Sequence, residues 1–159
     1  MTTRSGLIVG RFDPPHLGHS FLIDSAATQC DRLVVYVNSG AADAAPGDLR
    51  AAWLAELHPD VRVIEVSHDL ATNWDDEGLW AKWIALFRAH WPYDGGPDAV
   101  FSSEGYSAEL AKRLGAEPIV VDQERLNVPI SATMIRTDPA RHLDQLAPAV
   151  RAWVESNWL

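Results

Sequence analysis

Short apolar runs alternate along the chain with longer segments in which apolar residues recur every three or four positions. The short runs have the length of buried strands and lie at residues 7–9, 32–37, 61–66, 99–101 and 118–121. The segments between them have the spacing of helices with one buried face. Because each parallel connection needs a crossover, this order predicts an α/β fold, a single doubly wound (Rossmann-like) sheet of five parallel strands with helices on both faces.

Capping and turn residues predict where these elements end. Asp48 is expected to cap the helix that stops before Pro59, and Asp75 or Asp76 the helix that carries Trp80. Residues 61–66 alternate between polar and apolar side chains, which is typical of a strand at a sheet edge. Further helices are predicted over residues 106–114, with Gly115 after the last turn, and after Pro139 and Pro148, where two C-terminal helices close the core.

The composition narrows the class of ligand. Thirteen Lys and Arg stand against 22 Asp and Glu, so the formal net charge is −9. This charge disfavours nucleic acids and anionic membranes as partners, whereas a polyphosphate needs only a local positive site. The length predicts one domain over residues 1–159, and the lack of a long apolar run or charged leader predicts a cytoplasmic protein. The single Cys30 is expected to be a buried, inert thiol on the apolar side of the first helix.

The most informative segment runs from Gly10 to His19 and reads GRFDPPHLGH. It follows the first predicted strand and leads into a helix, and it carries Arg11, His16 and His19. A helix N-terminus presents unpaired N–H groups and the positive end of the helix dipole, so this order predicts an anion site. Zinc binding by the two histidines is disfavoured because zinc needs at least a third ligand, and no metal site is predicted.

The same segment resembles the HxGH signature of the nucleotidylyltransferase superfamily. Residues 130–136, ISATMIR, resemble its second signature, ISxTxxR, with Ala132 where glycine is more usual. Three further stretches, residues 46–53, 80–87 and 102–115, resemble the nicotinamide mononucleotide (NMN) adenylyltransferase domain of bifunctional bacterial NAD-biosynthesis proteins. The resemblance covers nearly the whole chain. The chain has no G-x-x-x-x-G-K-[ST] segment, which is the phosphate-binding motif of many kinases, so we expect no fused kinase activity.

The resemblance implies transfer of AMP from ATP to NMN, which yields NAD and pyrophosphate. It assigns His16 and His19 to the α- and β-phosphates, and Arg136 with Arg11 to the β- and γ-phosphates. Mg²⁺ is expected to be held mainly by the ATP phosphates, with Asp13 in contact through water. The other residues implied in ATP binding are Gly10, Phe12, Gly18, Ser131, Thr133, Met134, Ser102, Ser103 and Glu104. Those implied in NMN binding are Trp80, which is expected to stack on nicotinamide, Asn38, Ser39 and Arg50.

Several alternatives stay open at the level of the sequence. Trp80 lies at helical spacing with other aromatic residues, so it is either a stacking or a packing residue, while Trp83 is assigned to the core. Arg50 is either a ligand contact or a solvated helix charge. Another small-molecule nucleotidyltransferase, such as a phosphopantetheine adenylyltransferase or an alcohol-phosphate cytidylyltransferase, shares both signatures. A non-catalytic NAD-binding sensor is a further alternative, which the presence of both histidines and Arg136 disfavours.

Overall fold

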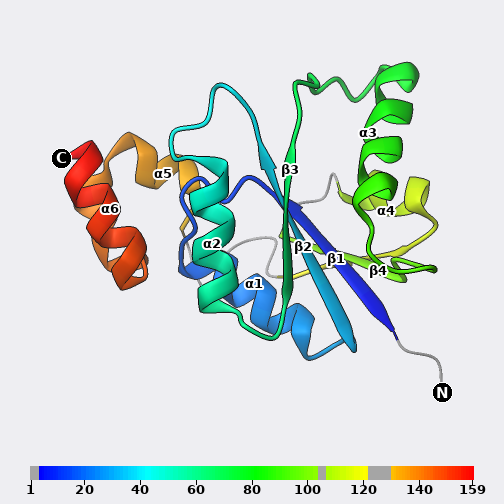
Figure 1. Cartoon of the computed structure of the whole chain (residues 1–159), viewed down its shortest axis with the longest axis horizontal. Helices are drawn as coiled ribbons and strands as arrows, with labels where there is room; N and C mark the ends of the chain where they lie inside the picture. The colour runs from blue at the N-terminus through cyan, green and yellow to red at the C-terminus, as the bar shows by residue number, and fades with distance from the viewer. Residues whose placement is uncertain (1–3, 104–106, 122–129) are drawn as a thin grey trace.

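The computed structural model describes residues 4–103, 107–121 and 130–159 (Figure 1). Its strands are β1 Ser5–Gly10, β2 Arg32–Ser39, β3 Arg62–Ser67, β4 Ala99–Ser102 and β5 Glu117–Val120. Its helices are α1 Leu17–Ala27, α2 Gly47–Leu57, α3 Glu77–His90, α4 Ser107–Leu114, α5 Ala132–Thr137, the 3-10 helix η1 Pro139–Gln145 and α6 Pro148–Trp158. None of the helices in these ranges is long and apolar enough to cross a membrane.

The five strands form one parallel sheet in the order β3-β2-β1-β4-β5. The chain builds outward from β1 to β3, then returns and adds β4 and β5 on the other side of β1. The topological switch point therefore lies between β1 and β4, and the carboxyl ends of these strands are where such sheets bind ligands. The predicted parallel sheet is confirmed, and so is the edge position of β3.

Helices cover both faces of the sheet, as predicted. Successive side chains of a strand point to opposite faces. Ile8 and Val35 pack with residues of α1 and α2, whereas Leu7 and Val34 pack with residues of α3 and α4. Figure 1 shows these two helix pairs on opposite sides of the sheet. A third cluster joins α5 and α6 to Trp53 of α2, so the C-terminal segment packs beside α2.

Three local predictions differ from the structure. Helix α2 begins at Gly47, so Asp48 lies in its first turn and not at the N-cap, and its carboxylate accepts from the Leu49 N–H at 2.9 Å. Cys30 follows α1 instead of lying on it, although its half-buried thiol has a pKa raised by burial, as expected of an inert group. The segment after Pro139 is a 3-10 helix with a kink at His142; none of its side chains is fully buried, although Leu143 packs against the third cluster.

Candidate functional site

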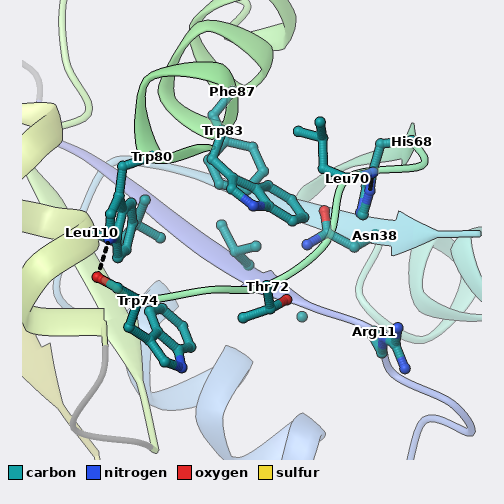
Figure 2. Close-up of a pocket in the computed structure, with 12 residues that line it drawn as sticks. Arg11, Asn38, His68, Leu70, Thr72, Trp74, Trp80, Trp83, Phe87 and Leu110 are labelled. Atoms are coloured by element: carbon teal, nitrogen blue, oxygen red, sulfur yellow. Dashed lines mark hydrogen bonds between the residues drawn. The ribbon is translucent and has the colours of Figure 1, made fainter. Parts of the chain in front are cut away.

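Two cavities meet at the carboxyl end of β1. Both are lined by Val9, Gly10 and Arg11, and their volumes are about 310 and 280 Å³. We call the first the tryptophan cavity; its lining includes Asn38, His68, Leu70, Thr72, Trp74, Trp80, Trp83, Phe87 and Leu110 (Figure 2). We call the second the histidine cavity; its lining includes Phe12, His16, Gly18, His19, Ser102, Ser103, Ser131, Thr133 and Arg136. The structure thus brings the two sequence signatures together around one hollow.

His16 and His19 cap the N-terminus of α1. The Nδ1 atom of His16 accepts from the backbone N–H groups of Gly18 and His19, at 3.0 and 3.3 Å, and Nδ1 of His19 accepts from the His16 N–H at 3.2 Å. A nitrogen that accepts carries no proton, so each neutral ring bears its N–H on Nε2. The rings stack with centroids 3.7 Å apart. The loop therefore fixes the tautomer of both histidines and holds both rings on the wall of one cavity.

Gly18 and Phe12 hold the two rings in place. A Cβ atom at Gly18 would lie 2.8 Å from Cε1 of His16, so only glycine leaves room for the capping imidazole. Phe12 has a φ of 54°, which an aromatic residue seldom adopts, and its buried ring meets His19 edge-on at 4.7 Å. The loop keeps this uncommon backbone at the cavity wall, next to His19.

Arg136 reaches from α5 back to the first signature. Its Nη1 donates to the carbonyl of Asp13, and its Nη2 donates to Thr133 Oγ1 at 3.3 Å. The guanidinium is exposed and lines the histidine cavity, as predicted for a phosphate contact. Ser131 caps α5 by accepting from the Met134 N–H at 3.2 Å. Because that N–H is used in the cap, the predicted contact between Met134 and an anion is not supported.

Asp13 has a structural role in this arrangement. Its two carboxylate oxygens accept from the N–H groups of Ala44 and Ala45, each at 2.8 Å, and its side chain is buried. The carboxylate therefore fastens the loop between β2 and α2 to the first signature. The predicted water-mediated contact between Asp13 and Mg²⁺ stays a prediction: Asp13 borders the histidine cavity, and its two oxygens have more acceptor positions than the two N–H groups use.

Arg50 and Ser39 lie outside both cavities. Arg50 is fully buried and forms an ion pair with the Asp43 carboxylate. Its guanidinium also donates to three backbone carbonyls, those of Ala45 (2.9 Å), Asn38 (3.2 Å) and Arg11. It thereby ties the ends of β1 and β2 to the loop before α2. Ser39 donates to a Glu65 carboxylate oxygen at 2.8 Å, in a separate hollow. Direct contact of either side chain with NMN is therefore not supported.

Two tryptophans of α3 line the tryptophan cavity, and the sequence prediction had assigned only one of them, Trp80, to a ligand. Trp80 lines the cavity, but the residue is only 6% exposed and the Arg113 guanidinium lies 4.6 Å from the centroid of its ring. Stacking of nicotinamide on Trp80 stays a prediction, and Arg113 leaves at most one face of the ring for it. Trp83, assigned to the core, packs on the core and also lines the cavity, where its ring is partly exposed and meets His68 edge-on at 4.4 Å.

His68, which the sequence prediction did not select, lines the tryptophan cavity together with Asn38, which it did select. Nδ1 of His68 accepts from the Leu70 N–H at 3.1 Å, so its neutral ring carries the proton on Nε2. Oδ1 of Asn38 is buried without a hydrogen-bond partner in the described part of the chain. A buried acceptor in this state is costly unless a ligand or water supplies a donor. The available signal for His68 was its place directly after β3, at the same sheet edge as the other loops.

Two serines predicted to contact ATP lie at the carboxyl end of β4, which ends at Ser102. Ser102 and Ser103 line the histidine cavity, and the Ser102 hydroxyl contacts that of Ser107 at the start of α4. Glu104, the third member of the predicted adenosine site, lies outside the described residues.

The lowered pKa values of His58 and His68 make the stability of the fold depend on pH. Burial lowers the pKa of His58 below 6.5, against the nearby Asp24, and burial together with the Arg11 charge lowers the pKa of His68. The unfolded chain therefore binds more protons than the folded protein below pH 6.5. We expect the free energy of unfolding to decrease as the pH falls from about 7 through the lowered pKa values.

Urea unfolding at several pH values measures this slope. The variant His58→Gln/His68→Gln should show a smaller decrease over the same range. If the free energy of unfolding fell equally steeply with pH in the wild type and the double variant, His58 and His68 would not be its cause.

Comparison with known proteins identifies the fold and the family. A family profile described as Cytidylyltransferase-like matches residues 7–138. The trifunctional NAD biosynthesis/regulator protein NadR of Escherichia coli strain K12 is 25% identical over 166 aligned residues, which cover 92% of this chain and 39% of that protein. The chain thus spans less than half the length of this curated relative.

Solved structures show the same fold. A NadR protein in complex with NAD and AMP-PNP aligns with a TM-score of 0.67 and 23% identity, over 90% of this chain and 44% of that one. A bifunctional NMN adenylyltransferase/ADP ribose pyrophosphatase from Francisella tularensis, complexed with AMP and a manganese ion, aligns with a TM-score of 0.58 and 14% identity, over 86% and 42% of the two chains.

Proposed function

This chain belongs to the cytidylyltransferase-like family of nucleotidyltransferases, and we propose that it transfers AMP from ATP to nicotinamide mononucleotide, forming NAD and pyrophosphate. One observation carries the proposal: a cavity with histidines at a helix N-terminus and a cavity with indole walls meet at Gly10 and Arg11. The first suits a polyphosphate and the second a planar ring. A NadR protein of the same fold was solved in complex with NAD and AMP-PNP, which supports nucleotides as the class of ligand.

The proposed reaction needs alignment and charge stabilisation. The attacking group is the 5′-phosphate of NMN, which is already an anion, so no general base or covalent intermediate is required. In the histidine cavity, Nε2–H of His16 and His19 donates to the phosphates of ATP, and Arg136 neutralises the departing pyrophosphate. Arg11 lines both cavities, so its charge lies between the two phosphates that must approach each other.

Mg²⁺ is proposed to enter with the nucleotide. Within the described ranges, no group of three or more His, Cys, Asp or Glu residues is arranged to hold a metal ion. Asp13, the acidic side chain of the first signature, accepts from the backbone N–H groups of Ala44 and Ala45. This environment suits a cation coordinated by the ATP phosphates and water, where it offsets phosphate charge. The residues of this chain would then bind the phosphate oxygens that the ion leaves available.

The tryptophan cavity favours a neutral carboxamide over a carboxylate. Among the described residues that line it, Arg11 alone carries a permanent positive charge, and Arg11 lies at the end shared with the histidine cavity. Away from that end the walls are mainly apolar and aromatic. A nicotinate carboxylate bound there would lose water without gaining a cation, whereas a carboxamide loses less and can donate to Asn38.

The reaction itself is the first test. Purified protein with Mg-ATP should release pyrophosphate and form NAD when NMN is supplied, and it should turn over nicotinic acid mononucleotide with a lower kcat/KM. Phosphopantetheine with ATP, and an alcohol phosphate with CTP, test the other nucleotidyltransferase activities in the same assay. Binding of NAD without pyrophosphate release from any pair would instead support the sensor alternative and contradict our proposal.

A further inference from the structure

The segment between β3 and α3, residues 68–76, crosses the tryptophan cavity and forms one of its walls. We call it the strap. It contributes His68, Leu70, Thr72 and Trp74 to the lining, although it contains no helix or strand. Figure 2 shows it passing in front of the sheet from His68 to Trp74. The shape of the cavity therefore depends on how this irregular segment is held.

Two indole groups of α3 hold the strap. Nε1 of Trp80 donates to the Trp74 carbonyl at 3.0 Å, and Nε1 of Trp83 donates to the Ala71 carbonyl, also at 3.0 Å. The two tryptophans are three residues apart and so lie on one face of the helix. Asp76, the last residue of the strap, accepts from the Leu79 and Trp80 N–H groups and so fixes only that end to α3. The bond from the Asp75 N–H to Asn73 is local and does not fix the rest of the strap relative to α3.

The donor helix is itself anchored to α4. Arg113 donates to both carboxylate oxygens of Glu77, in the first turn of α3, at 2.8 and 2.7 Å, and to Glu109 at 2.8 Å. The same guanidinium covers the Trp80 ring. The buried indole of Trp80 is therefore covered by Arg113 on one side while its edge donates to the Trp74 carbonyl of the strap.

We propose that Trp80 and Trp83 are positioning residues, whose indole N–H groups set the strap at the distance from α3 that the acceptor of the transfer reaction requires. This inference rests on the proposed function only in taking the tryptophan cavity as the acceptor site. Phenylalanine would fill much of the same space but offers no N–H donor, and a strap freed from both bonds would carry His68 and Trp74 with it. Acceptor binding should then weaken while ATP binding, in the histidine cavity, stays unchanged.

The experiment compares Trp80→Phe, Trp83→Phe and the double variant with the wild type. Each lost hydrogen bond should raise KM for the acceptor about 3- to 10-fold and leave KM for ATP within about 2-fold. Hydrogen–deuterium exchange over residues 69–76 should speed up in the same variants. The matched control is Trp91→Phe: Trp91 donates Nε1 to the Gly95 carbonyl at 2.8 Å and lines neither cavity, so its loss should change neither measurement.

An isosteric substitution separates positioning from direct contact. Incorporating 3-benzothienylalanine at position 80 or 83 keeps the shape and the ring faces but replaces N–H by sulfur. If the indoles position the strap, this variant behaves like the phenylalanine variant; if they only touch the ligand, it behaves like the wild type, and the inference is wrong. Unchanged exchange over the strap would also overturn it. Absence of transfer to any acceptor by the wild type would count against the proposed function alone, because exchange reports on the strap without activity.

Discussion

Replacing His19 by alanine is expected to lower kcat about 100-fold or more while the protein stays folded. The imidazole is held by stacking on His16, by edge contact with Phe12 and by its own bond to the His16 N–H, so its Nε2–H is oriented before substrate binds. Loss of one such preorganised donor typically costs about 10²- to 10³-fold in kcat. The stability cost is about 1 kcal/mol, because part of the helix cap is removed.

Conservative variants show which nitrogen matters. His19→Asn keeps an oxygen near the position of Nδ1 for the His16 N–H but has no group at Nε2, so it should be nearly as inactive as the alanine variant and more stable. His90→Ala is the control, because His90 bonds to the Leu86 carbonyl at 2.9 Å and lines neither cavity. Steady-state kinetics and melting midpoints measure both effects. If a folded His19→Asn variant kept near-normal kcat, Nε2 of His19 would have no role in the reaction, and the prediction would be wrong.

Replacing Arg50 by alanine is expected to lower the free energy of unfolding by about 3–5 kcal/mol, the usual cost of breaking a buried ion pair. The guanidinium is fully buried, and its loss leaves the nearly buried Asp43 carboxylate and three backbone carbonyls without their donor. Arg50→Lys should recover little, because one ammonium group cannot reach all of these acceptors. Chemical denaturation of the purified variants gives the measurement.

A second substitution tests the reason for the loss. Arg50→Leu combined with Asp43→Leu removes both buried charges, so the double variant should be more stable than Arg50→Leu alone. The exposed pair Arg151 and Glu155, 3.2 Å apart, is the matched control; Arg151→Ala should cost at most about 1 kcal/mol. If Arg50→Ala instead kept its stability and raised only KM for NMN, the direct ligand contact would be the better interpretation.

Local patterns in the sequence determined the fold class and the position of the site. Runs such as residues 32–37 form a strand because a short, continuous apolar segment is stable only when both of its faces are covered. The placement of His16 and His19 between a strand and a helix also follows from the local order of residues. Because the first signature directly follows β1, it lies at the carboxyl edge of the parallel sheet, where such sheets bind ligands.

Only the tertiary structure decided which of the selected side chains face the cavities. Arg50 and Asp13 use the backbone groups of distant loops as partners, and backbone carbonyls and N–H groups leave no trace in the residue pattern. The helical pattern of α3 assigned Trp83 to the core because every position on that face is apolar. Which part of the face borders the cavity depends on the path of the strap, and that path is set by hydrogen bonds between side chains and backbone, which helical periodicity does not encode.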